Sequence, residues 1–342
     1  MRYFNSSGPN IIDQHYTLMR PELVLKGLDN VHKERYFTIW APRQTGKSTY
    51  FRLLATELEK EGYKVVCLDC KHFDTVTVEV FLEAFHLQLK QALGIEIQSD
   101  SVVATFNKIM NIKNLKFVLI VDGVDNINPT FLGNFLISIR VAFHSRSDHA
   151  LKSVILGGVK NVLDIVHDMG SSFNIADDFR FPYFTDAETF ELIEQHEFDT
   201  GQLFDPSVKK RISLMSGNQP NLVSGLSALL VEEKLEKALI TYNDYLEIED
   251  LYAPKAINKN TLDIVQKNSK CRILIERLLF TEAKIRFQIM REDIQTLYFE
   301  GIVSCDENGY VMFRVPLYKK YLHQAFYPYL DGEADHIRDE PI

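Results

Sequence analysis

The sequence has few of the features that mark disulfide-rich, membrane-spanning or nucleic-acid-coating proteins. Its four cysteines, among 342 residues, are too few and too scattered for a disulfide scaffold. No apolar run reaches the roughly 18 residues of a membrane span, and the N-terminus lacks a signal-peptide pattern. A net charge of −9 argues against non-specific binding to nucleic acid or anionic membranes. We therefore expect a globular cytoplasmic protein that does not associate with membranes.

Apolar runs alternate with amphipathic helical patterns through the first half of the chain. Strands are expected at 36–40, 64–69, 117–122 and 153–158, with a short fifth strand at 179–184. Helices are expected between them, at about 48–61, 77–92, 101–112 and 130–144. This alternation predicts an α/β fold in which a parallel sheet has helices on both faces.

The stretch APRQTGKS at 41–48 stands between the first predicted strand and the first predicted helix. It matches the phosphate-loop pattern G-x-x-x-x-G-K-[ST], except that Ala41 replaces the first glycine, which is acceptable if φ stays negative there. In this pattern backbone N–H groups cradle phosphates, Lys47 reaches the β- and γ-phosphates, and the Ser48 hydroxyl ligates magnesium. The predicted nucleotide-binding residues of this stretch are Ala41, Pro42, Arg43, Gln44, Thr45, Gly46, Lys47, Ser48 and Thr49.

A second motif, FVLIVDGVDNI at 117–127, places Asp122 at the end of a predicted strand. A carboxylate at the C-terminal end of a strand that neighbours the phosphate-loop strand holds magnesium through water. Ser48 and Asp122 are thus the predicted metal ligands, and ATP with Mg²⁺ the predicted cofactors. Two roles stay open for Asp125: orienting the attacking water or capping the next turn. Lys47, Asp122 and Asp125 are the predicted catalytic residues.

The composition changes after the sheet region. Residues 186–252 are helical throughout, and 302–315 reads as a hairpin with its turn at 307–309, preceded by further helices. The expected fold is a P-loop NTPase sheet followed by a small helical lid and a winged-helix-like domain. The predicted domains are a nucleotide-binding core (1–185), the lid (186–252), the winged-helix-like domain (253–330) and an acidic tail (331–342).

Several motifs together resemble a family of prokaryotic AAA-like ATPases close to the STAND signalling NTPases. They are FNSSGPNIIDQHYTL (4–18), YFTIWAPRQTGKST (36–49), SVILGGVKNV (153–162), DTGQLF (199–204), SGNQPNLV (216–223) and FRVPLYKKY (313–321). The resemblance covers most of the chain. It implies an ATP-binding protein with a segment before the phosphate loop on the adenine side.

The resemblance also implies residue roles. His15, Tyr16 and Arg20 would contact the adenine, and plain packing is the alternative for His15 and Tyr16. Lys160 or Asn161 would lie near the γ-phosphate as a sensor, and a solvated lysine is the alternative. The pair Gln219–Pro220 would form a lid turn that contacts the nucleotide, and a helix N-terminus with proline in its first turn is the alternative.

Two departures from the family pattern affect the prediction. Gly123 stands where the family has an acidic residue, which removes a candidate general base and predicts slow hydrolysis. A Gly123→Glu change is therefore expected to raise turnover if the remaining geometry is competent. Asn218 replaces a glycine of the lid turn, and asparagine tolerates the left-handed backbone that such a turn needs.

Three functions fit these motifs. In the first, ATP holds the core and lid closed, and the C-terminal domain signals to a protein partner. The second is a DNA-handling AAA ATPase of the origin-recognition or transposition-helper type, and the third is a scaffold with structural nucleotide. Residues 255–330 carry twelve Lys and Arg against eight Asp and Glu, but no basic cluster marks a recognition helix, so the switch is favoured over DNA binding. A nucleotide-dependent homo-oligomer is a further option, since AAA relatives often place an arginine from a neighbouring subunit at the γ-phosphate. Arg140 and Arg146 lie in a region of the sequence compatible with that role, and whether either acts in trans stays open.

Overall fold

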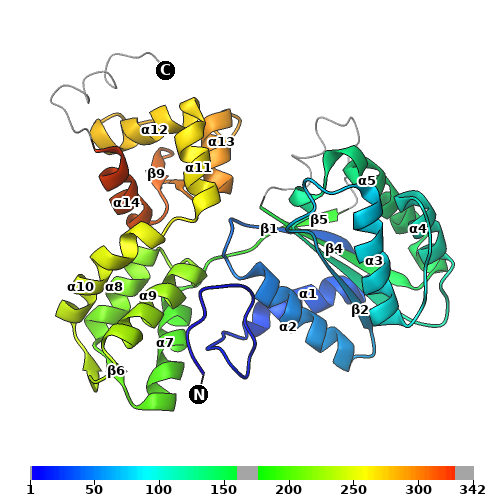
Figure 1. The fold of residues 1–342 in the computed structure, drawn as a ribbon, viewed down its shortest axis with the longest axis horizontal. Coiled ribbons are helices and arrows are strands. Elements are labelled where there is room, and N and C mark those ends of the chain that lie inside the picture. The colour runs from blue at the N-terminus through cyan, green and yellow to red at the C-terminus, as the bar shows by residue number, and fades with distance from the viewer. Residues whose placement is uncertain (1, 160–175, 328–342) are drawn as a thin grey trace. The chain divides into compact units, whose positions relative to one another are not determined.

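The computed structural model describes residues 2–159 and 176–327. The chain forms two compact units, which we call the sheet unit and the helical unit (Figure 1). The sheet unit comprises Met19–Ala41 and Gly46–Phe181. The helical unit comprises Met1–Leu18, Pro42–Thr45 and Pro182–Ile342. The boundary after Phe181 lies close to the predicted boundary after 185, whereas residues 1–18, predicted as part of the core, belong to the helical unit.

The sheet unit is built on five parallel strands in the order β2-β3-β4-β1-β5. The strands are β1 (Tyr36–Trp40), β2 (Lys64–Asp69), β3 (Phe117–Asp122), β4 (Leu151–Gly158) and β5 (Ala176–Arg180). Its helices are α1 (Pro21–His32), α2 (Lys47–Lys60), α3 (Val78–Leu93), α4 (Val102–Met110) and α5 (Pro129–His144). The parallel α/β fold predicted from the alternating pattern is confirmed.

Helices cover both faces of the sheet because alternate strand residues point to opposite sides. In β3, Val118 and Ile120 pack in the core with α1 and α2, while Leu119 and Val121 pack in the core with α3, α4 and α5. Figure 1 shows these two helical layers flanking the strands. The inner strands β1, β3 and β4 read as mostly apolar runs in the sequence because both of their faces are buried.

Two predictions about the sheet were wrong. The fifth strand is β5 at Ala176–Arg180, not 179–184, and it pairs with β1 from Tyr36↔Ala176 to Trp40↔Arg180. In addition, β3 does not lie next to the phosphate-loop strand β1, because β4 pairs with both. Asp122 therefore stands two strands away from the strand that leads into the phosphate loop.

The helical unit begins its main body with the helices predicted as the lid. These are α7 (Asp186–Thr200), α8 (Pro206–Ser216), α9 (Pro220–Glu233) and α10 (Tyr242–Tyr252), with the short parallel pair β6 (Leu203–Phe204) and β7 (Leu239–Ile240). The lid turn carries left-handed backbone at Gly217 (φ +56°) and Asn218 (φ +58°). The prediction that asparagine supports this turn is confirmed.

The C-terminal part of the helical unit has the predicted succession of helices and hairpin. Its elements are α11 (Lys259–Lys267), α12 (Ser269–Phe280), α13 (Glu292–Phe299), β8 (Val303–Cys305), β9 (Val311–Phe313) and α14 (Pro316–Phe326). The hairpin turn has Gly309 at φ +83°, and the Asp306 carboxylate accepts from two backbone N–H groups in it. Leu317 and Tyr318 are buried in the core of the helical unit. The predicted tail, 331–342, lies outside the described residues, and the winged-helix assignment stays a prediction.

Candidate nucleotide-binding site

The sheet unit places the last residues of the phosphate-loop motif at the start of a helix. Gly46 is the N-cap of α2 and has φ +89°, a conformation that glycine adopts without a steric penalty. Lys47, Ser48 and Thr49 form the first turn of α2, whose free N–H groups suit phosphate oxygens. Ala41, directly after β1, is buried and is not among the residues with positive φ, so its methyl group is accommodated as predicted.

The two predicted metal ligands meet in the sheet unit. The Ser48 hydroxyl donates a hydrogen bond of 2.5 Å to Oδ2 of Asp122, at the C-terminal end of β3. The Lys47 ammonium donates to the carbonyl of Ala41 at 2.7 Å. A hydroxyl and a carboxylate oxygen at this separation, beside a helix N-terminus, are hard oxygen donors of the kind that Mg²⁺ prefers. The donor chemistry therefore fits a magnesium ion bound together with phosphates.

A second cationic side chain, Lys71, reaches the oxygens of Ser48 and Asp122. Its ammonium lies 3.3 Å from Oγ of Ser48, 3.2 Å from Oδ2 of Asp122 and 3.1 Å from Oδ2 of Asp69. Partial burial opposes the charge on Lys71, but the carboxylates of Asp122 and Asp69 outweigh it and raise the pKa of Lys71. Lys71 was not among the site residues predicted from the sequence.

Lys71 has a traceable signal in the sequence. It follows β2 by two residues, and the register of the sheet aligns Asp69 at the end of β2 with Asp122 at the end of β3. Because parallel strands end at the same edge of the sheet, a charged residue just beyond one strand is near the end of its neighbour. Recognising Lys71 from the sequence would have required knowing that β2 and β3 are neighbours.

Gly123 and Asp125 occupy positions that the backbone restricts. Gly123 has φ +84°, and a Cβ there would lie 2.9 Å from Nδ2 of Asn126. The expectation that a glutamate at 123 would raise turnover is therefore not supported, because any side chain at this position is strained. Asp125 lies in a short 3-10 turn and its carboxylate accepts from the backbone N–H of Val159 at 3.3 Å. This contact ties the turn to the residue after β4.

The description "AAA-like domain" belongs to the family that matches this chain over residues 12–324. The chain is a member of this AAA-like family. None of the curated proteins matches it closely enough to count as a relative.

Solved structures of P-loop ATPases share the fold. The Walker-type ATPase PABY2304 of Pyrococcus abyssi is 11% identical, with a TM-score of 0.69 over 94% of this chain and 99% of that one. The RuvB Holliday junction branch migration motor of Thermotoga maritima is 12% identical, with a TM-score of 0.51 over 91% and 94%. Cdc6p of Pyrobaculum aerophilum is 16% identical, with a TM-score of 0.51 over 90% and 95%. At these identities the likeness shows the P-loop ATPase fold alone.

The AAA-like chain carries Gln219 and Pro220 at the start of α9, as the helix alternative predicted. Gln219 is the N-cap and its side-chain oxygen accepts from the N–H of Leu222 at 2.8 Å. Its amide nitrogen donates to the carbonyls of Gln44 at 3.2 Å and Arg43 at 3.4 Å. Gln219 therefore contacts backbone of the phosphate-loop motif, within the helical unit to which Pro42–Thr45 belong.

The proposed adenine-side residues are engaged in packing in the AAA-like chain. His15 is buried and its two ring nitrogens meet the N–H of Ile11 and the hydroxyl of Tyr3, each at 2.9 Å. Tyr16 is 1% exposed and its hydroxyl lies 3.3 Å from Nδ1 of His196 in α7. These contacts favour the packing alternative, and an adenine contact stays a prediction. The sensor candidates at 160 and 161 lie outside the described residues.

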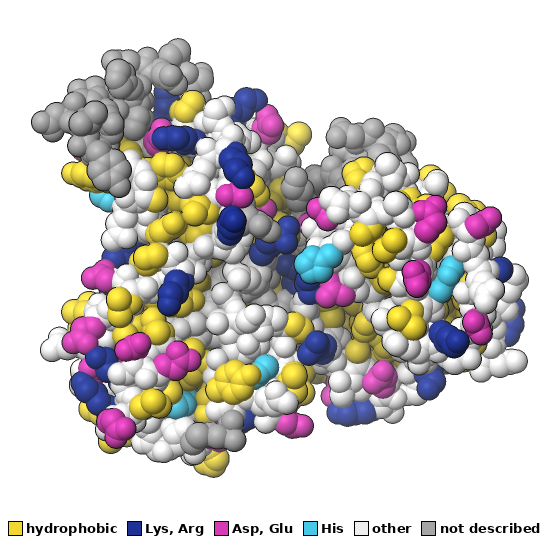
Figure 2. All heavy atoms as spheres, viewed as in Figure 1, with side chains coloured by type: hydrophobic (Ala, Val, Ile, Leu, Met, Phe, Trp, Pro, Cys, Tyr) yellow, Lys and Arg dark blue, Asp and Glu magenta, His cyan; other side chains and the backbone are white. Residues whose placement is uncertain are grey.

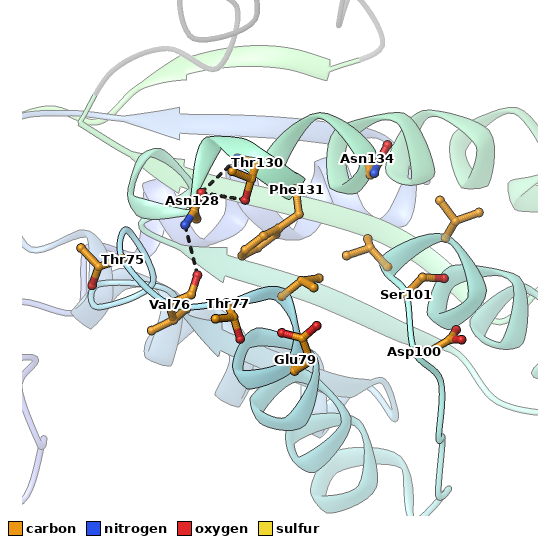
Figure 3. Close-up of a pocket in the computed structure, with 13 residues that line it drawn as sticks. Thr75, Val76, Thr77, Glu79, Asp100, Ser101, Asn128, Thr130, Phe131 and Asn134 are labelled. Carbon is orange, nitrogen blue, oxygen red and sulfur yellow. Dashed lines mark hydrogen bonds between the residues drawn. The ribbon is translucent and has the colours of Figure 1, made fainter.

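A pocket of about 510 Å³ in the sheet unit lies apart from these residues. Figure 3 shows it among the first turns of α3, α4 and α5, with Asn128 bonded to Thr130 and to the carbonyl of Val76. Its lining includes none of the residues that the sequence singled out. Among the described residues, no helix is long and apolar enough to cross a membrane.

Proposed function

We propose that this AAA-like protein is an ATP-dependent molecular switch with magnesium-dependent, slow ATP hydrolysis. The observation that carries the proposal is the convergence of Ser48, at the start of α2, with Asp122, at the end of β3, next to the first turn that bears Lys47. A hydroxyl, a carboxylate and an ammonium so placed supply the three functions that phosphoryl-group binding needs. The family membership supports the same conclusion.

Each residue has a distinct role in this proposal. The N–H groups of the first turn of α2 bind phosphate oxygens, and Lys47 neutralises the β- and γ-phosphates. Ser48 and Asp122 would hold the magnesium ion, and the bound ion would stabilise negative charge on the phosphate oxygens. The remaining loop residues, Pro42 to Thr45, contribute backbone groups, and the Thr45 hydroxyl steadies them by donating to the carbonyl of Pro42 at 2.9 Å.

Slow turnover follows from the two positions that could hold a general base. Position 123 is a glycine in left-handed conformation, and Asp125 already accepts a backbone hydrogen bond from Val159. General-base assistance contributes about 10²–10⁴-fold to a rate. We therefore expect a turnover below the median of about 10 per second. A switch needs such slow turnover because the bound state must persist long enough to be recognised.

The contact of Gln219 with the phosphate-loop backbone supports the coupling that a switch requires. Phosphates bound by the loop polarise and fix its peptide groups, and two of those carbonyls are held by the side chain that also caps α9. A change in the conformation of the phosphate loop therefore acts directly on the side chain that caps α9. The state is passed to a protein partner through the C-terminal elements, and nucleotide-dependent self-association is a second output of the same switch.

Calorimetric titration with ATP tests the proposal. Lys47→Ala should abolish detectable ATP binding, because it removes the cation that neutralises the phosphates, whereas Ser48→Ala should weaken only binding in the presence of Mg²⁺. Lys64→Ala is the matched control: it removes the same charge at the far, exposed end of β2. Unchanged ATP affinity in Lys47→Ala would show that the phosphate-loop assignment is wrong.

A DNA-handling role is the second candidate. It is favoured by the local charge of +4 in residues 255–330 and by the shared fold with RuvB of Thermotoga maritima, a Holliday junction branch migration motor. Five of the twelve basic residues there are paired with carboxylates, however: Lys267, Lys270, Arg272, Arg291 and Lys320. Basic and acidic side chains are also mixed over the face drawn in Figure 2. This charge pattern is the reason that we place DNA second.

Duplex binding by the full chain at about 50 and 200 mM salt, with and without ATP, separates the two candidates. Displacement of phosphate counterions makes DNA binding fall steeply with salt. Tight binding that collapses at the higher salt concentration would favour the DNA-handling role over the switch.

A further inference from the structure

The Lys71 ammonium touches the same oxygens that the proposed function assigns to magnesium. Oγ of Ser48 and Oδ2 of Asp122 lie 3.3 Å and 3.2 Å from Nζ of Lys71. The Asp122 side chain is only 14% exposed, so this pair is partly shielded from water. All the groups belong to the sheet unit and lie at the carboxyl edge of β2 and β3.

A divalent ion and this ammonium cannot use these oxygens together. A magnesium ion would lie about 2.0–2.1 Å from the Ser48 hydroxyl oxygen and would reach the Asp122 carboxylate through a water ligand, so the ion and this water would need the space beside the two oxygens that Lys71 contacts. An ammonium that remained in contact with the same two oxygens would then stand within a few ångströms of a doubly charged ion, where the repulsion is strong and only weakly screened. Entry of the metal therefore requires the Lys71 side chain to leave.

Asp69 can keep an ion pair with the Lys71 side chain after that side chain has left Ser48 and Asp122. Its Oδ2 lies 3.1 Å from Nζ of Lys71, and its side chain is 62% exposed. Its other carboxylate oxygen accepts from the backbone N–H of Lys71 at 3.1 Å, which fixes Asp69 beside the lysine. Lys71 can therefore keep one carboxylate partner while it releases Ser48 and Asp122.

We propose that Lys71 is an internal competitor of the magnesium ion: its ammonium holds Ser48 and Asp122 in the metal-free state, and a divalent cation must displace it toward Asp69. The proposal rests on the ATP site described above and identifies a residue that sets how much metal that site requires. By holding the two ligands together, Lys71 also preserves their arrangement between rounds of metal binding. Its presence raises the magnesium concentration at which the nucleotide complex forms.

The test measures the Mg²⁺ concentration for half-maximal effect on binding of a fluorescent ATP analogue. Lys71→Met keeps the length of the side chain and removes its charge. This change should lower the half-maximal Mg²⁺ concentration by roughly two- to fivefold, the range expected for loss of a partly exposed ion pair. Lys71→Arg retains a cation and should stay close to the unaltered chain. Lys64→Met, at the opposite end of β2, should have no effect.

Direct titration with Mn²⁺ in the absence of nucleotide, followed by electron paramagnetic resonance, is the second measurement. Lys71→Met should bind Mn²⁺ more tightly than the unaltered chain, because no ammonium competes for Asp122. An unchanged or increased metal requirement in Lys71→Met, with nucleotide binding intact in the unaltered chain, would overturn this inference alone. Failure of the unaltered chain to bind nucleotide at all would overturn the proposed function as well.

Discussion

The turn after β3 depends on glycine at position 123, and replacing it tests that dependence. Gly123 has φ +84°, and an added Cβ would meet Nδ2 of Asn126 at 2.9 Å. The same Nδ2 donates to the carbonyl of Gly123 at 3.4 Å. A Gly123→Ala change therefore introduces both an unfavourable backbone conformation and a steric contact, immediately after the metal ligand Asp122.

The two costs can be assessed separately. Left-handed backbone costs an L-residue about 1–2 kcal/mol relative to glycine. Moving the Asn126 amide aside breaks its hydrogen bond, worth about 0.5–1.5 kcal/mol net. Gly123→Ala should therefore lower the free energy of unfolding of the sheet unit by about 1.5–3.5 kcal/mol. Gly62→Ala supplies the control, because Gly62 has φ +86° with no atom within 4 Å of an added Cβ.

Urea unfolding followed by circular dichroism is the assay, and both glycines belong to the sheet unit, so one transition reports on both variants. We expect Gly62→Ala to show the backbone cost alone, about 1–2 kcal/mol, and Gly123→Ala to show more, with unchanged slopes against denaturant. Gly123→Glu should not exceed the ATPase rate of the unaltered chain, since its backbone strain displaces Asp122. Equal effects of the two alanine variants would refute the crowding argument, and a faster Gly123→Glu would refute the strain argument.

Two further changes probe the helical unit. Gln219→Glu keeps the side-chain oxygen that caps α9 but loses the amide that donates to the carbonyls of Arg43 and Gln44. We expect the free energy of unfolding to fall by about 1–3 kcal/mol and calorimetry to show weaker ATP binding. Unchanged ATP binding would exclude coupling between the phosphate loop and α9. Glu249→Gln removes the buried carboxylate that lies 3.2 Å from Arg211 and 2.7 Å from Lys320, and Lys320 keeps its pair with Asp250 at 2.6 Å. The loss should be about 1–3 kcal/mol in thermal unfolding, since both cations are partly exposed. Burial alone would raise the pKa of Glu249, but Lys320 and Arg211 outweigh it and lower the pKa below 4.5. Its stabilising contribution is therefore complete above about pH 4.5 and is lost as the pH falls through the lower native value, so the Gln variant should lose less stability on acidification.

The strands that the sequence predicted well are those that contain adjacent apolar residues. The bounds of β1, β2 and β3 coincide with the predicted ranges because each is a continuous apolar or nearly apolar run ended by polar residues. β5 was misplaced because its sequence, ADDFR, has two acidic residues and lies at the edge of the sheet, partly exposed. Edge position alone does not hide a strand, since β2 lies at the opposite edge of the sheet and was predicted from its apolar residues Val65, Val66 and Leu68.

The candidate nucleotide-binding site also has features that the sequence predicted and features that it did not. The phosphate-loop motif and Asp122 were recognisable because their chemistry requires fixed residue types at fixed spacing along the chain. The conformational role of Gly123 was not, since a glycine in the sequence does not reveal the sign of φ. The packing of Tyr16 against His196, 180 positions away, is also a property of the folded chain.

The sequence by itself determined the parallel α/β character, the phosphate loop, the strand that ends at Asp122 and the helical nature of residues 186–252, because local periodicity and motif spacing encode these features. Only the tertiary structure decided that β4 lies between β1 and β3, that Lys71 reaches Ser48 and Asp122, and that Gln219 holds the carbonyls of Arg43 and Gln44. The physical reason is the same in each case. Strand order and contacts between distant residues depend on how separate elements pack together. The energy of that packing cannot be inferred from the residues of any single segment of the chain.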